Sequence, residues 1–146
     1  MTTDDTPIPD ITTAHDPIRG TEDLRQRWRA LMGELGFSAG RIWFAFVGTD
    51  RRLVKILDWL PLPPEPDAHL VDMLTGGLTS AVDQLPVTSV AFLISRPGRD
   101  GVTDVDQAWA TVLIESARRN GLPIQPIHRA NDVHLVTLTT ALDAAA

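Results

Sequence analysis

Two histidines near the C-terminal end of the sequence are the first candidates for metal chemistry. His128 and His134 stand on either side of a short polar stretch that contains Asp132. Imidazole and carboxylate groups are normal ligands of zinc and iron. No closed ligand spacing surrounds them, so we predict no metal site and regard two edge-strand histidines as the simpler interpretation. The remaining histidines, His15 and His69, lie where solvated side chains are expected.

A second group of polar residues lies between an apolar run and a helix start. Arg96 and Arg99 occupy the position at which α/β proteins usually bind ligands, and guanidinium groups bind carboxylates and phosphates. Asp106 follows in the first turn of the helix. These three residues are our candidate ligand-binding residues. The segment lacks the glycine and lysine spacing of a phosphate-binding or dinucleotide-binding loop, so a solvated connection is the alternative.

No group of residues forms a recognisable catalytic motif. The chain has no cysteine, which excludes thiolate nucleophiles, disulfide bonds and zinc sites built on sulfur. Its serines lack the sharp strand-to-helix motif of a hydrolase nucleophile. We therefore predict no catalytic residue and no cofactor.

Composition narrows the possible partners. The net charge of -6 disfavours attraction to a phosphate backbone, so no nucleic-acid partner is expected. No stretch approaches the roughly 18 apolar residues of a membrane span, and the acidic, proline-rich start is unlike a secretory signal. We expect a cytoplasmic protein that binds another protein or a small ligand, with a homodimer as one form of that interaction.

The apolar pattern predicts one α/β domain over 19–140, after a disordered tail over 1–18 and before a fraying end over 141–146. The predicted fold is a mixed sheet of about five strands flanked by three helices, in the order α-β-β-α-β-α-β-β. The expected helices span 21–35, 70–85 and 103–120. The expected strands span 41–47, 53–60, 89–94, 124–128 and 133–138, with the continuously apolar third strand at the centre of the sheet.

Local signals refine these elements. Thr103 and Asp106 have the spacing of a capping box at the start of the third helix, and Val105 is expected to face inward. Gly76 and Gly77 inside the second helix favour close approach of another backbone over a bend. All four tryptophans are expected in the core.

The strand Val90–Ile94, the turn 95–98, the helix opening 103–106 and the segment from Gly121 to His128 resemble the JAB/MPN metalloprotease-like domain of bacterial RadC-type proteins. In that family a strand ends in a His-x-His-Pro motif, and a Ser and an Asp near the next helix complete a zinc site. When Pro97 is matched to the motif proline, Ile94 and Arg96 stand at the two histidine positions, and Thr103 and Asp106 at the Ser and Asp positions.

The departures from the family pattern decide what this resemblance implies. Both imidazole ligands are missing, and the glutamate that acts as general base in the family has no counterpart here. The resemblance, over about residues 37 to 138, therefore implies a scaffold that kept the fold and lost the metal chemistry. Two alternatives remain: a small metal-dependent hydrolase using His128, His134 and acidic residues of 100–106, and an anion-binding module using Arg96 and Arg99.

Overall fold

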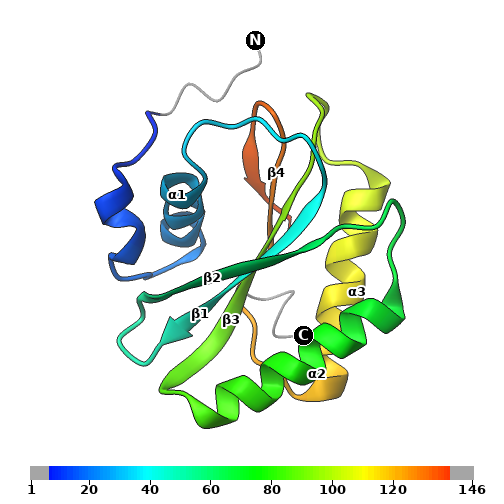
Figure 1. The fold of residues 1–146 in the computed structure, drawn as a ribbon. Coiled ribbons are helices and arrows are strands. Elements are labelled where there is room, and N and C mark those ends of the chain that lie inside the picture. The colour runs from blue at the N-terminus through cyan, green and yellow to red at the C-terminus, as the bar shows by residue number, and fades with distance from the viewer. Residues whose placement is uncertain (1–6, 139–146) are drawn as a thin grey trace.

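The computed structural model describes residues 7–138 and confirms the predicted fold class. A five-stranded mixed sheet has the strand order β2-β1-β3-β4-β5. Helix α1 covers one face, and α2 and α3 cover the other (Figure 1). The elements are η1 (Ile11–His15), α1 (Thr21–Met32), β1 (Arg41–Gly48), β2 (Leu53–Pro61), α2 (Ala68–Gln84), β3 (Val87–Ser95), α3 (Asp104–Asn120), β4 (His128–Ala130) and β5 (Leu135–Thr137).

Strand β3 is the central strand of the sheet, as its apolar run predicts. It pairs with β1 in the antiparallel direction and with β4 in the parallel direction. Its side chains alternate between two hydrophobic clusters. Phe92 and Ile94 pack on the side of α2 and α3, whereas Ala91 and Leu93 pack on the side of α1. Burial on both faces explains why the strand does not alternate between polar and apolar residues.

The three helices begin in different ways. The capping box of α3 is confirmed, since Thr103 accepts the Asp106 N–H and the Asp106 side chain accepts the Thr103 N–H. The Asp67 side chain caps α2. Helix α1 has Gly20 at its N-cap, with no side-chain cap, and it ends at Met32, before the predicted end at residue 35.

The structure has a folded segment within the stretch 1–18 that we predicted as a disordered tail, and residues 1–6 of that stretch lie outside the described residues. Residues 11–15 form a 3-10 helix, and Asp10 caps it by accepting the Thr12 N–H. Ala14 is fully buried and Ile18 is nearly so. Their burial against α1 and β2 supplies the tertiary contacts that sequence composition does not reveal. The predicted fraying end, 141–146, lies outside the described residues.

The last two strands differ from the prediction. We expected strands over 124–128 and 133–138, but β4 and β5 have three residues each. Ile124 makes only an isolated bridge with Val90. The turn between the strands covers 131–134, so His128 opens β4 instead of closing a strand.

Three side-chain predictions also need correction. Val105 is 46% exposed and does not face inward. A side chain at Gly76 would make only ordinary contact with Asn120, and one at Gly77 would meet nothing, so close packing does not explain these glycines. Trp28 and Trp109 are buried in the core, but Trp59 is 38% exposed.

Candidate functional site

The carboxyl end of β3 opens into a cavity of about 360 Å³. Three connections form it: the residue that precedes β1, the proline-rich segment after β2, and the β3–α3 loop with the first turns of α3. Such a place, outside the carboxyl end of a central strand, is where open α/β sheets bind ligands. The lining residues are Gly40, Leu62, Pro63, Pro64, Arg96, Asp100, Thr103, Val105, Asp106 and Trp109.

Arg96 lies in the wall of this cavity, but its guanidinium is fully engaged. Its Nε and Nη2 donate to the two carboxylate oxygens of Asp106 at 2.7 and 2.8 Å. Its Nη1 donates to Asp100 at 2.9 Å and to the Pro97 carbonyl at 3.1 Å, and Nη2 also reaches the Gly101 carbonyl at 3.3 Å. A guanidinium has five N–H donors. All five have acceptors within the protein, so Arg96 has none left for an anion.

Asp106 is the centre of the charged network. Its side chain is 2% exposed and accepts hydrogen bonds from Arg96 and from the Thr103 N–H. Burial by itself raises the pKa of Asp106, but the bonds from Arg96 and Thr103 outweigh it and hold the pKa below its ordinary value. The carboxylate is therefore ionised at neutral pH and unsuited to proton transfer.

Arg129 is a member of this network that sequence analysis missed. Strand β4 places it on the α3 side of the sheet, where its side chain is 1% exposed and its Nε lies 3.4 Å from Asp106 Oδ2. Burial lowers its pKa, and the Asp106 charge opposes that shift. Its Nη1 has no hydrogen-bond partner within 7–138. Only the parallel pairing of β4 with β3, which the sequence does not show, brings Arg129 to Asp106.

The β3–α3 loop is held by the β4–β5 turn. Asn131 is fully buried and donates to the Asp100 carbonyl at 2.7 Å. Asp132 accepts the N–H groups of Gly98 and Phe37 at 2.9 and 2.8 Å, and these bonds hold the pKa of its carboxyl below the usual range. The loop that the sequence suggested was a solvated connection is thus bonded on both sides, which keeps the cavity wall in place.

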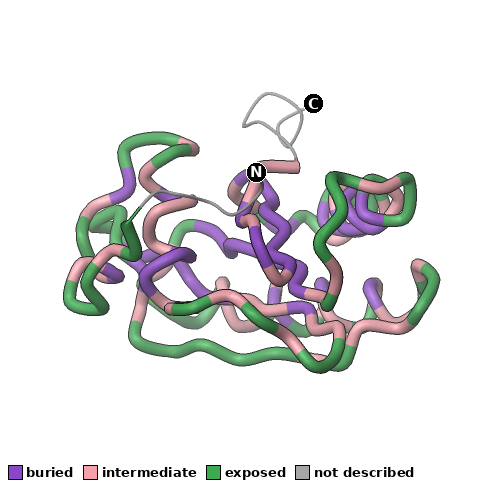
Figure 2. The backbone as a smooth tube through the Cα atoms, turned by 90° about the horizontal axis from the view of Figure 1, so that it is seen from above, coloured by how far each residue is buried: buried purple, intermediate pink, exposed green. Residues whose placement is uncertain are grey.

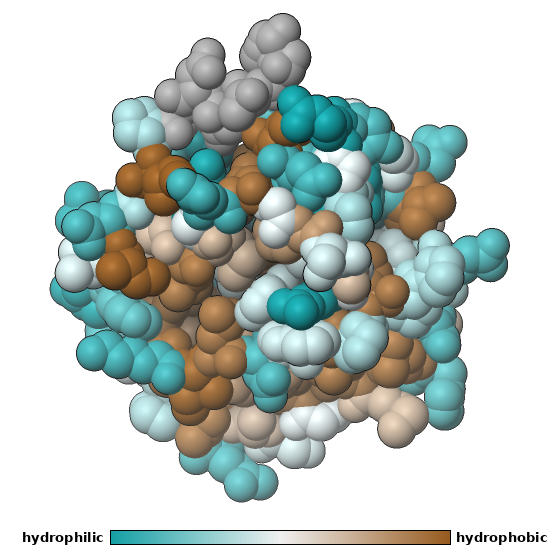
Figure 3. Space-filling model, turned by 45° about the horizontal axis from the view of Figure 1, so that its top comes forward, coloured by the Kyte–Doolittle hydropathy of each residue, from teal (hydrophilic) through white to brown (hydrophobic). Residues whose placement is uncertain are grey.

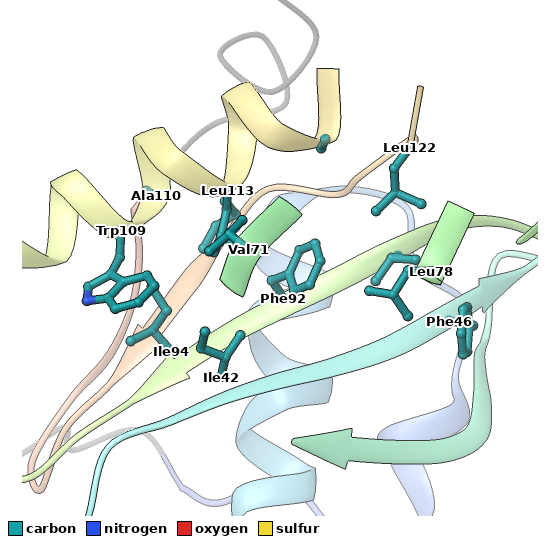
Figure 4. Packing of buried hydrophobic residues seen from close by; sticks show 13 residues of the cluster. Ile42, Phe46, Val71, Leu78, Phe92, Ile94, Trp109, Ala110, Leu113 and Leu122 are labelled. Carbon is teal, nitrogen blue, oxygen red and sulfur yellow. The ribbon is translucent and has the colours of Figure 1, made fainter. Parts of the chain in front are cut away.

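Trp109 lines the cavity and also has a buried polar atom without a partner. Its side chain is 1% exposed, and the Nε1–H has no acceptor among the described residues. Figure 4 shows the indole nitrogen pointing away from the other labelled core side chains. A buried donor left unpaired costs about 1 to 3 kcal/mol. The nitrogen itself is closed off from solvent, so Trp109 borders the cavity with other atoms of its side chain.

The three predicted ligand-binding residues do not form one site. Arg96 and Asp106 both line the cavity, whereas Arg99 is exposed and lies outside the wall, with its charge near Asp132. The predicted anion site therefore loses the only free guanidinium of the pair. Arg96 and Asp106 line the cavity as an ion pair whose charges cancel.

The three candidate metal ligands do not form a metal site either. His128 is fully buried and faces α1, where burial, with the nearby charge of Arg25, lowers its pKa to about 4. Asp132 is engaged with two backbone N–H groups, and His134 is half-buried in the β4–β5 turn. Within the described residues, no group of three or more His, Asp or Glu side chains has an arrangement suited to a metal ion.

Strand β2 presents apolar side chains to solvent at one edge of the sheet. Figure 2 shows this strand as a long exposed run beside the buried central strands. Ile56 is 51% exposed, and Arg41 lies 4.0 Å over the ring of Trp59. Asp58 accepts the Trp59 N–H, and Lys55 and Pro61 lie on the same strand. Charged side chains and proline on an edge strand discourage pairing with a strand from another molecule. In Figure 3 apolar surface occupies several separate areas of the visible face.

Comparisons with known proteins assign no family. No family model matches the sequence, and no curated protein matches it. Within residues 7–138, none of the helices combines the length and apolar character that a bilayer crossing requires.

Proposed function

We propose that this chain is a non-catalytic binding domain of JAB-like architecture whose cavity at the carboxyl end of β3 takes a small uncharged ligand. The observation that carries the proposal is the cavity itself, in which apolar side chains and Trp109 adjoin the internally paired charges of Arg96 and Asp106. The volume of about 360 Å³ is within the usual range for small-molecule sites.

The residues at the positions of the family's zinc ligands do not fit a zinc ion. Ile94 packs in the core between the sheet and α3. Arg96 directs its guanidinium at Asp106, so a fixed positive charge already neutralises the one carboxylate there. Thr103 caps α3. A zinc site needs at least three protein ligands, and this set offers one that is already bonded. These contacts support a scaffold without metal chemistry.

The charges and the apolar walls favour an uncharged ligand. Arg96 is paired with Asp106 and Asp100, so the wall presents no free cation to an anion. Apolar surface comes from Leu62, Pro63, Pro64, Val105 and Trp109. A small ring without charge matches these walls. The protein partner or homodimer expected from the sequence stays a prediction.

The test uses two exposed valines of the same segment. Val105 lines the cavity, whereas Val102 does not. Calorimetric titration with nicotinamide and with uracil is expected to show binding in the millimolar range for the wild type. Val105→Phe fills the entrance and should abolish binding, and Val102→Phe should keep it. Equal affinities for both variants, or no binding by the wild type, would refute the proposal.

A further inference from the structure

A second cavity, of about 490 Å³, lies at the opposite end of the sheet from the first. The start of α1, the β1–β2 turn, the beginning of β3 and the segment that leads to β4 form it. The first three of these segments lie together at the left of Figure 1. The lining residues used below are Arg19, Gly20, Thr21, Arg51, Thr88 and Pro126.

Two arginines line this cavity without using their charges elsewhere. The side chains of Arg19 and Arg51 make no ion pair or hydrogen bond with any residue of 7–138, and both residues are exposed. Two other arginines of these segments, in contrast, are bonded to backbone carbonyls. Arg52 donates to the His15 carbonyl at 3.1 Å, and Arg27 donates to the Pro17 carbonyl at 2.9 Å. Two free guanidinium groups therefore border one cavity in a chain whose net charge is -6.

The first turn of α1 opens into the same space. Gly20 at the N-cap provides no side-chain acceptor, and Asp23 accepts the backbone N–H of Arg19 instead of one from the helix. Glu22 is paired with Arg25. The N–H groups of the first helical turn carry a partial positive charge and are the usual donors to a phosphate.

A buried histidine lies behind this wall. His128 is fully buried, and neither ring nitrogen makes a hydrogen bond of normal geometry within the described chain. Its position in β4 turns the ring toward α1, and the backbones of Thr21 and Pro126, both cavity residues, lie close enough to affect its pKa. His128 therefore packs behind Thr21 and Pro126 and does not itself line the cavity.

We propose that this cavity is an anion site for a phosphate group, held by Arg19, Arg51 and the first turn of α1. Guanidinium groups bind phosphate oxygens through paired N–H donors, and the helix start adds backbone donors. The group belongs either to inorganic phosphate or to a phosphomonoester. This site is separate from the cavity beside Trp109 and does not depend on it.

The test compares the two arginines that line the cavity with a neighbouring arginine outside it. Calorimetric titrations with inorganic phosphate and with AMP use the wild type and the variants Arg51→Gln, Arg19→Gln and Arg52→Gln. We expect the first two variants to weaken phosphate binding roughly tenfold each, because each removes one charge-assisted contact. Arg52→Gln removes the same charge outside the cavity and should change the affinity less than about twofold.

The outcomes separate the two sources of the phosphate group and decide the proposal. Tighter binding of AMP than of phosphate indicates a phosphomonoester, and equal binding indicates inorganic phosphate. The proposal is overturned if neither compound binds at about 10 mM. It is also overturned if Arg52→Gln weakens binding as much as Arg51→Gln, because binding would then follow net charge.

Discussion

Asp106 shows how one residue can have a structural role that its sequence context only half reveals. Its place in the capping box could be read from the spacing to Thr103. Its contacts with Arg96 and Arg129 could not, because Arg129 follows 23 positions later and reaches Asp106 only through the β3–β4 pairing. The buried carboxylate balances two guanidinium groups.

Removing the charge of Asp106 should therefore destabilise the protein. Asp106→Asn leaves the buried Arg129 without its counter-charge, and breaking a buried pair in this way costs about 3 kcal/mol. Urea unfolding measures the loss. Asp104→Asn removes an exposed carboxylate from the same helical turn and should cost less than about 1 kcal/mol. Similar losses for the two variants would show that the network contributes little to stability.

His128 should make stability depend on pH. Burial lowers its pKa in the folded state from 6.5 to about 4, so the unfolded chain binds a proton first as the pH falls. The stabilisation that comes from a neutral His128 is complete above pH 6.5 and is lost progressively as the pH falls to about 4. Between pH 6.5 and about pH 5 the free energy of unfolding should fall by about 2 kcal/mol from this residue.

Unfolding of His128→Gln over the same pH range isolates this contribution. The variant should lose most of the slope, whatever its absolute stability. His134→Gln, which changes a half-buried histidine in the β4–β5 turn, should keep it. A wild-type slope in His128→Gln would assign the pH dependence to other groups.

The sequence predicted helices and strands correctly where the pattern that defines them is local. Apolar runs identified β1, β2 and β3, and helix signals located α2 and α3 to within a few residues. It failed for β4 and β5, since strands of three residues are defined by their neighbours rather than by their own pattern. It also failed for the β3–α3 loop, whose bonds to Asn131 and Asp132 are contacts over long sequence distances.

Asn131 is predicted to control the order of that loop. Asn131→Ala removes a donor to the Asp100 carbonyl and an acceptor for the N–H groups of Val133 and His134. The expected loss of stability is about 2 to 3 kcal/mol. Hydrogen exchange over residues 96–103 should accelerate, whereas the exposed control Gln107→Ala should leave it unchanged. Unaltered exchange in Asn131→Ala would mean that the loop is held by its other contacts.

For the whole molecule, the rigid sheet separates two cavities of different chemistry. The cavity beside Trp109 has paired charges and apolar walls, and the cavity at the start of α1 has two free arginines. The sequence located the first region through Arg96 and Asp106 but missed Trp109 as a polar group, because a tryptophan in an apolar helix stripe is ordinarily core. It gave no sign of the second region, which four separate segments build.

The Nε1–H signal of Trp109 in a proton–nitrogen correlation spectrum reports whether a small uncharged ligand occupies the cavity at the carboxyl end of β3. Trp28 provides the internal control, because its Nε1–H is also buried without an acceptor in the described chain but Trp28 does not line the cavity. When nicotinamide is added, we expect a shift of the Trp109 signal, because this residue lines the cavity, and none of the Trp28 signal. An unchanged Trp109 signal in the presence of bound nicotinamide would contradict this expectation.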